Sequence, residues 1–209
     1  MLSFNEAQNF VDYHEIIECI SGALDAKDPN TANHSQRVSD MALTICKHMG
    51  FKNADIEKIH IAAHLHDIGK IGVPDYILNK TARLSKSEWE LIKQHPVTGA
   101  NILNRSSKLS ELSSIVRHHH ERYDGKGYPD GLNGTEIPVG ARIIAICDSI
   151  DAITNNRCYR EARDMDFCYQ EIEKNLGLMY DPIIGSFVLD YWDAIVRNTN
   201  QSIRNTSLL

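Results

Sequence analysis

The sequence lacks the features of disulfide-rich, membrane-spanning and nucleic-acid-binding proteins. Its five cysteines are odd in number and show no CxxC spacing, so we expect reduced thiols that mostly fill the core. No apolar run approaches the roughly 20 residues of a membrane helix, and the first residues do not resemble a signal peptide. The net charge of −6 argues against a nucleic-acid polymer as partner. We therefore expect a cytoplasmic protein that contacts neither a membrane nor a nucleic-acid polymer.

Most stretches with a periodic apolar pattern have helical spacing. A chain of 209 residues with 42% hydrophobic content suits one domain. We expect helices over residues 11–26, 38–49, 53–63, 85–95, 109–119, 141–147 and 182–195. Asn53 is the expected cap of the third, Ser85 and Glu88 form a capping box for the fourth, and Pro96 interrupts that fourth helix.

Residues 124–140 break this pattern, because they hold five glycines and two prolines. Such a stretch is an extended loop, and a loop of this length in a compact domain tends to be functional. The sequence therefore predicts an all-α, compact helical bundle with one long Gly/Pro-rich loop.

Five histidines and two aspartates recur along the chain as candidate metal ligands: His34, His66, Asp67, His95, His119, His120 and Asp148. Neutral imidazole and carboxylate are the usual protein ligands of borderline and hard divalent metals. Asp148 ends an apolar run, where an unpaired carboxylate would be costly to bury. The set suffices for two metals if Asp67 bridges them.

Two strings contain most of these residues: HDIGK at 66–70 and HHERYDGKGYP at 119–129. At these positions the chain resembles the HD-GYP family of metal-dependent phosphodiesterases, a branch of the HD phosphohydrolase superfamily. The resemblance extends from about Asp28 to Pro182. It implies a catalytic domain over 27–197, preceded by a helix over 1–26 that packs on the core or on a partner, and followed by a polar, frayed tail over 198–209.

The resemblance also implies two divalent transition-metal ions. One ion would be held by His34, His66, Asp67 and Asp148, and the other by Asp67, His95, His119 and His120. Iron or manganese is expected first, and nickel or zinc is compatible with the same ligands. Asn30 stands where some family members have a glutamate that helps to hold a third ion, which favours two ions here.

The activity that the resemblance implies is hydrolysis of a cyclic dinucleotide, cyclic di-GMP first and a mixed guanine–adenine one second. A metal-bridging hydroxide would attack the phosphodiester. Asp67 and Lys70 are the expected catalytic residues, and the expected substrate contacts are Asp28, Lys70, Arg157 and Arg160. Cys158 replaces the proline that the family usually has between two basic residues.

Several other residues have simpler expected roles. Glu121 is expected to accept a ring N–H from the paired histidines, and Tyr128 to pack in a loop that forms a wall of the site. His60 and His64 have the spacing of a zinc pair but face away from His66. His14, His48 and His118 are expected to be exposed or capping residues.

Two other functions stay open. A nucleotide hydrolase of the wider HD superfamily would not require the second group of histidines or the long loop. A binding module without useful turnover would have no reason to retain all seven candidate ligands. A homodimer or a signalling partner, held through the first helix or the Gly/Pro-rich loop, is also compatible with the sequence.

Overall fold

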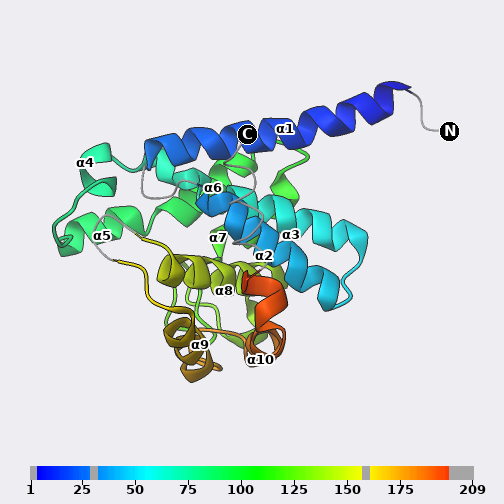
Figure 1. Cartoon of the computed structure of the whole chain (residues 1–209). Coiled ribbons are helices and arrows are strands. Elements are labelled where there is room, and N and C mark those ends of the chain that lie inside the picture. The colour runs from blue at the N-terminus through cyan, green and yellow to red at the C-terminus, as the bar shows by residue number, and fades with distance from the viewer. Residues whose placement is uncertain (1–3, 29–32, 157–160, 198–209) are drawn as a thin grey trace.

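The computed structural model describes residues 4–28, 33–156 and 161–197, and within these ranges it contains helices and no strand (Figure 1). The predicted all-α fold is therefore confirmed. None of the described helices is both long and apolar enough to cross a membrane. Of the described cysteines, Cys46, Cys147 and Cys168 are buried and Cys19 is exposed, in agreement with thiols that mostly fill the core.

The core lies between three helices that are distant in sequence. These are α2 (His34–His48), α3 (Asn53–Leu65) and α8 (Val139–Thr154). Many of their buried residues are aliphatic, and Val38, Leu65 and Ile143 are each fully enclosed. Burying such side chains contributes about 1.5–3 kcal/mol each, so these three helices form the rigid centre on which the other elements are placed.

The remaining helices cover this centre on two sides (Figure 1). On one side α1 (Phe4–Lys27) lies across the bundle, with Ile17 and Leu24 buried. On the other side lie α9 (Met165–Lys174), α10 (Pro182–Asp190) and a π-helical turn (Asp193–Arg197). The second half of α1 thus packs on the core.

The segment between α3 and α8 consists of short helices. After α3, a 3₁₀ turn (Ile68–Gly72) leads to α4 (Asp75–Leu78), α5 (Lys86–Ile92), α6 (His95–Leu103) and α7 (Ser113–Arg117), with a 3₁₀ turn (Ser110–Leu112) before α7. The predicted loop follows, and only a short 3₁₀ turn (Gly134–Glu136) interrupts it before α8. The capping box of Ser85 and Glu88 at the start of α5 is confirmed.

Several predicted boundaries were wrong. Pro96 does not only end a helix, since it lies in the first turn of α6, where its missing N–H costs nothing. Lys52, not Asn53, precedes the first residue of α3. The single helix expected over 109–119 is divided into two short pieces, and α8 begins two residues early and continues to Thr154. Helix α9 was not predicted.

A close backbone contact joins the 3₁₀ turn after α3 to α6. A Cβ atom on Gly69 would lie 1.8 Å from the His95 carbonyl oxygen and 2.5 Å from the Gly99 nitrogen. No side chain can move aside to relieve such a contact, because both neighbours are backbone atoms. Glycine at position 69 is therefore required for α6 to lie against the HDIGK segment.

We expect Gly69→Ala to lower the free energy of unfolding by about 3 kcal/mol or more, because the added methyl group forces the two segments apart. Gly72→Ala is the matched control, since its Cβ would lie 3.4 Å from the Thr98 side chain, an ordinary contact. The control should change stability by less than about 0.5 kcal/mol. Urea unfolding measures both, and equal stability of the two variants would contradict the packing argument.

Candidate metal centre

All seven candidate ligands lie in the described residues and converge on one place. His34 is the first residue of α2, His66 and Asp67 follow the end of α3, and His95 is the first residue of α6. His119 and His120 follow α7, and Asp148 lies within α8. The site is thus built mainly from helix ends, and their packing on the core fixes its geometry.

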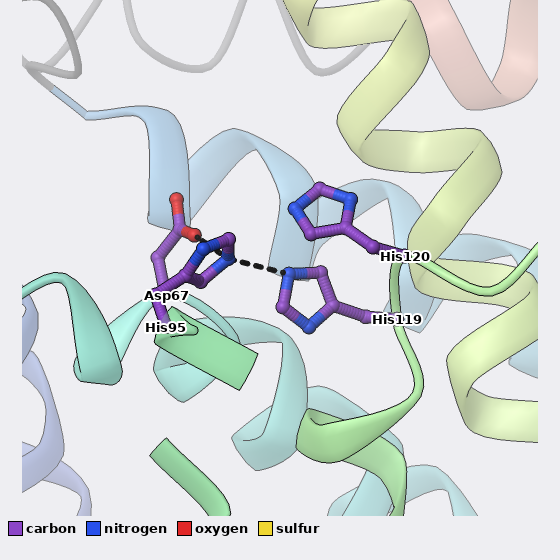
Figure 2. A group of neighbouring side chains, drawn as sticks. All are labelled: Asp67, His95, His119 and His120. Carbon is purple, nitrogen blue, oxygen red and sulfur yellow. Dashed lines mark hydrogen bonds and ion pairs between the residues drawn. The ribbon is translucent and has the colours of Figure 1, made fainter. Parts of the chain in front are cut away.

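The ligand atoms form two groups that share one carboxylate. One group is His34, His66 and Asp67, and the other is Asp67, His95, His119 and His120; within each group the ligand atoms lie within 4.8 Å of one another. Figure 2 shows the side chains of the second group facing a common centre. Asp148 lies beside the first group, with its Oδ1 3.4 Å from His34 Nε2.

The two oxygens of Asp67 point to different groups. Oδ1 is 3.2 Å from His95 Nε2, whereas Oδ2 is 3.4 Å from His66 Nε2 and 3.7 Å from His34 Nε2. A carboxylate in this position can give one oxygen to each of two cations.

Hydrogen bonds fix the protonation of four of these histidines. Their Nδ1 atoms lie 2.6 Å from Asp151 Oδ2 for His34, 2.7 Å from the Ala63 carbonyl for His66, 2.8 Å from the Ile92 carbonyl for His95 and 2.6 Å from the Val116 carbonyl for His119. A carbonyl or carboxylate oxygen can only accept a hydrogen bond, so each Nδ1 carries the proton. In the neutral ring, each Nε2 is then left with a lone pair.

These Nε2 lone pairs face one another inside the cluster. The Nε2 atoms of His34 and His66 are 3.3 Å apart, and so are those of His95 and His119. Two lone pairs repel each other at this distance unless a cation lies between or beside them. The residues therefore fit a divalent metal, and the bonds to Nδ1 are of the kind that orients metal-binding histidines.

The electrostatics of the cluster favour the metal-binding forms of its side chains. Burial would raise the pKa of Asp67, but Lys70 and the neighbouring histidines hold it well below the usual range. Burial, with a contribution from His95, lowers the pKa of His120 to about 3, and burial beside His120 likewise lowers that of His119. The Asp67 carboxylate is thus ionised, and His119 and His120 are neutral at neutral pH, as metal ligation requires.

Asp151 is a functional residue that sequence reasoning missed. It is buried, accepts the His34 Nδ1–H and is held by the Arg37 guanidinium through Nε and through Nη2 at 3.1 Å. This carboxylate orients the His34 ring and increases its basicity. The available signal was the spacing of Asp148 and Asp151, three residues apart and so on one face of α8.

Lys70 lies at the open side of the cluster, as expected. Its Nζ is 2.7 Å from Asp67 Oδ2 and 3.5 Å from Asp28 Oδ2. Burial would lower the pKa of Lys70, but these two carboxylates raise it. The ammonium group is therefore charged and is held between a residue of the cluster and a predicted substrate contact.

A cleft of about 670 Å³ opens in front of the cluster. Its inner wall includes Asp28, Asp67, Lys70, His95 and Asp148. Tyr128 of the Gly/Pro-rich loop also lines it, and its ring lies 4.9 Å from the His120 ring at 31°. The expected role of Tyr128 in packing is thus consistent with the structure.

Other expectations had mixed outcomes. Glu121 is not hydrogen-bonded to a ring nitrogen of the described histidines; instead its Oε1 accepts the N–H groups of Asp130 and Gly131 within the loop. His118 Nε2 bonds to Asp130 at 2.9 Å, which separates it from the ligand groups. His48 is exposed, as expected.

The histidine pair at positions 60 and 64 lies on α3, with ring centroids 4.9 Å apart. Among the described residues, neither belongs to a ligand group. Asn30, Arg157, Cys158 and Arg160 lie outside the described residues, and so does the side chain of His14, so their expected roles stay predictions.

A family model described as the HD domain matches residues 18–184 of this sequence. The chain belongs to the HD domain family. The matched region contains all seven candidate ligands and begins within α1. Family membership implies that the cluster binds divalent metal, in agreement with the convergent Nε2 lone pairs.

Known proteins similar to this chain are phosphodiesterases. A cyclic di-GMP phosphodiesterase of Thermotoga maritima is 39% identical over 181 residues, which cover 86% of this chain and 49% of that protein. The 3'3'-cGAMP-specific phosphodiesterase 2 of Vibrio cholerae is 31% identical, over 93% of this chain and 38% of that protein. The expected HD-GYP resemblance is thereby confirmed, and this chain spans half or less of the length of both relatives.

The fold is also that of a solved member of this group. A crystal structure of a cyclic GMP-AMP specific phosphodiesterase of V. cholerae superposes with a TM-score of 0.66 at 16% sequence identity, covering 90% of this chain and 52% of the other. At this level of identity the match shows that the helical fold is shared.

The adjacent histidines of the second string give a direct test of the ligand assignment. We expect His119→Ala to lose most of the metal bound by the second group, because its Nε2 faces the Nε2 of His95. His118→Ala is the matched neighbour, and it should retain full metal content because its ring bonds to Asp130. Metal analysis of both variants after metal-replete preparation tests which of the adjacent histidines are ligands. Metal loss in His118→Ala would contradict the assignment.

Proposed function

We propose that this protein is a phosphodiesterase that hydrolyses a cyclic dinucleotide, with cyclic di-GMP first and a mixed guanine–adenine cyclic dinucleotide second. The observation that carries the proposal is the position of Asp67, with one oxygen toward each of two histidine groups. The names of the similar proteins support the substrate class. We assign the catalytic domain to residues 27–197.

The proposed centre holds two divalent ions, iron or manganese first. His34, His66, Asp67 and Asp148 would hold one ion, and Asp67, His95, His119 and His120 the other. When bound, such a pair of ions supplies a nucleophile at neutral pH and neutralises charge on the phosphoryl oxygens.

The protein groups around the ions have separate tasks. Asp67 holds the two halves of the centre together. Asp28 holds the ammonium group of Lys70 at the open side of the cluster, which faces the cleft. There the Lys70 ammonium group would contact the phosphate of the bound substrate. Asp151 keeps the His34 ring in one orientation. Arg157 and Arg160 are proposed to bind the remainder of the ligand.

This proposal is tested directly by anaerobic purification, metal analysis and chromatography of the products formed from cyclic di-GMP. Turnover with about two ions per chain is the expected result. Hydrolysis of mononucleotides alone would favour the wider HD superfamily activity, and tight binding without turnover would favour an effector module.

Two substitutions test the bridging carboxylate. Asp67→Ala removes a ligand from both ions, so we expect it to lose most of the metal and all measurable turnover. His95→Ala removes one ligand from one ion, so it should retain part of the metal and still lose much of the activity. Metal analysis and initial rates distinguish the two, and an Asp67→Ala protein with two ions would exclude the bridge.

A further variant separates catalysis from binding. Lys70→Met removes a charge that acts on the phosphate most strongly in the transition state, so kcat should fall roughly ten- to a hundredfold. Metal content and affinity should stay near those of the wild type. Arg157→Met and Arg160→Met should instead raise KM at unchanged metal content. A Lys70→Met protein that loses affinity alone would contradict this division.

A further inference from the structure

The cleft in front of the metal centre has two walls of different chemistry. The inner wall contains His95, His120, Asp67 and Asp148 of the centre together with Lys70. The outer wall is formed by the segment 77–92, which contributes none of the seven ligands and contacts them through the Ile92 carbonyl that accepts the His95 Nδ1–H. Its cleft-lining residues include the apolar side chains of Leu84, Trp89 and Ile92 and three cations, Lys80, Arg83 and Lys86.

Trp89 is the largest side chain of this outer wall. It lies on α5 and lines the cleft, yet 45% of its surface is exposed. Its ring centroid is 6.4 Å from that of Tyr128, at an interplanar angle of 77°, and Tyr128 in turn lies against His120. A series of three aromatic rings therefore leads outward from the metal centre along the cleft.

The start of α5 is fixed in a way that holds Trp89 at the cleft. Ser85 and Glu88 form the capping box of the helix. Lys80 Nζ lies 2.7 Å from both oxygens of Glu88, which joins the preceding segment to the same helix turn. Trp89 directly follows Glu88 in the chain. The indole therefore lies on a helix turn that is held by the capping box and by the bonds between Lys80 and Glu88.

An exposed indole and cations in one cleft suit the bases of a cyclic dinucleotide. Such a ligand has two phosphates, one of which must reach the metal centre, and two bases that extend from the ring formed by its sugars and phosphates. Bases stack on aromatic side chains, and guanidinium groups bind phosphates and base edges. The outer wall supplies both kinds of contact in the same cleft, through Trp89 and Arg83.

We propose that the Trp89 indole is the stacking surface for one purine base of the substrate, and that it is a specificity-determining residue of this enzyme. This inference rests on the proposed function. It assigns to α5 the recognition of the base, while the metal centre and Lys70 act on the phosphate. Loss of the indole should therefore weaken binding without changing the reaction step.

Steady-state kinetics of Trp89→Ala test the inference. We expect KM for cyclic di-GMP to rise roughly ten- to a hundredfold, which is the effect of losing one base–aromatic contact. The value of kcat and the metal content should stay within about twofold of the wild type. Trp89→Phe should recover most of the affinity, because a smaller aromatic face remains. Cyclic di-UMP should be affected less, because a pyrimidine offers a smaller stacking area.

Leu91→Ala is the matched control. Leu91 lies on the same helix and is similarly exposed, at 48%, but it does not line the cleft. Its kinetics should equal those of the wild type. Should Trp89→Ala and Trp89→Phe both match the wild type in KM, the inference is wrong and the proposed function still stands. An equal rise in KM in Leu91→Ala would also overturn the inference, since the effect would then come from a general disturbance of α5 and not from the loss of the indole.

Fluorescence gives a second measurement that does not depend on turnover. The chain has two tryptophans, and Trp192 is buried at 8% exposure. In Trp192→Phe, rapid mixing with cyclic di-GMP should quench the emission of Trp89 before product forms. Quenching without hydrolysis would overturn the proposed function and keep the stacking site. Normal hydrolysis without quenching would overturn the stacking site alone.

Discussion

The site depends on one carboxylate that two groups of histidines share. Asp67 directs its Oδ1 to His95 and its Oδ2 to His66 and His34. The same Oδ2 also accepts the Lys70 ammonium group at 2.7 Å. A negative charge this deeply enclosed is stable only among such partners, which explains why the surrounding helix ends all direct their polar side chains toward this point.

Backbone packing makes this arrangement possible. His95 and Asp67 meet because α6 lies against the 3₁₀ turn after α3, and Gly69 allows the two backbones to touch. A similar contact occurs in the loop, where a Cβ on Gly127 would lie 2.4 Å from the Glu121 Cα. Gly69 and Gly127 of the two signature strings thus have steric roles. Gly69 also fixes the position of a ligand, His95, that is 26 residues further along the chain.

The helical fold and the residues that form the metal-binding cluster could be predicted from the sequence. Apolar residues at helical spacing predicted α2, α3, α8 and α10, because burial of one helix face leaves a periodic trace. Of the short helices between α3 and α8, α5 and α7 fall within predicted helices, whereas α4 and α6 were not predicted. Helix α9 was missed although its apolar face is buried through Cys168 and Ile172.

The sequence by itself determined which residues are able to bind metal, because imidazole and carboxylate groups in two specific strings are chemically distinctive. Only the tertiary structure decided which ring nitrogen faces the centre and that Asp151 orients His34. It alone also placed Trp89 in the cleft. The physical reason is that these facts depend on distances between helices, and such distances follow from packing of the core and not from spacing along the chain.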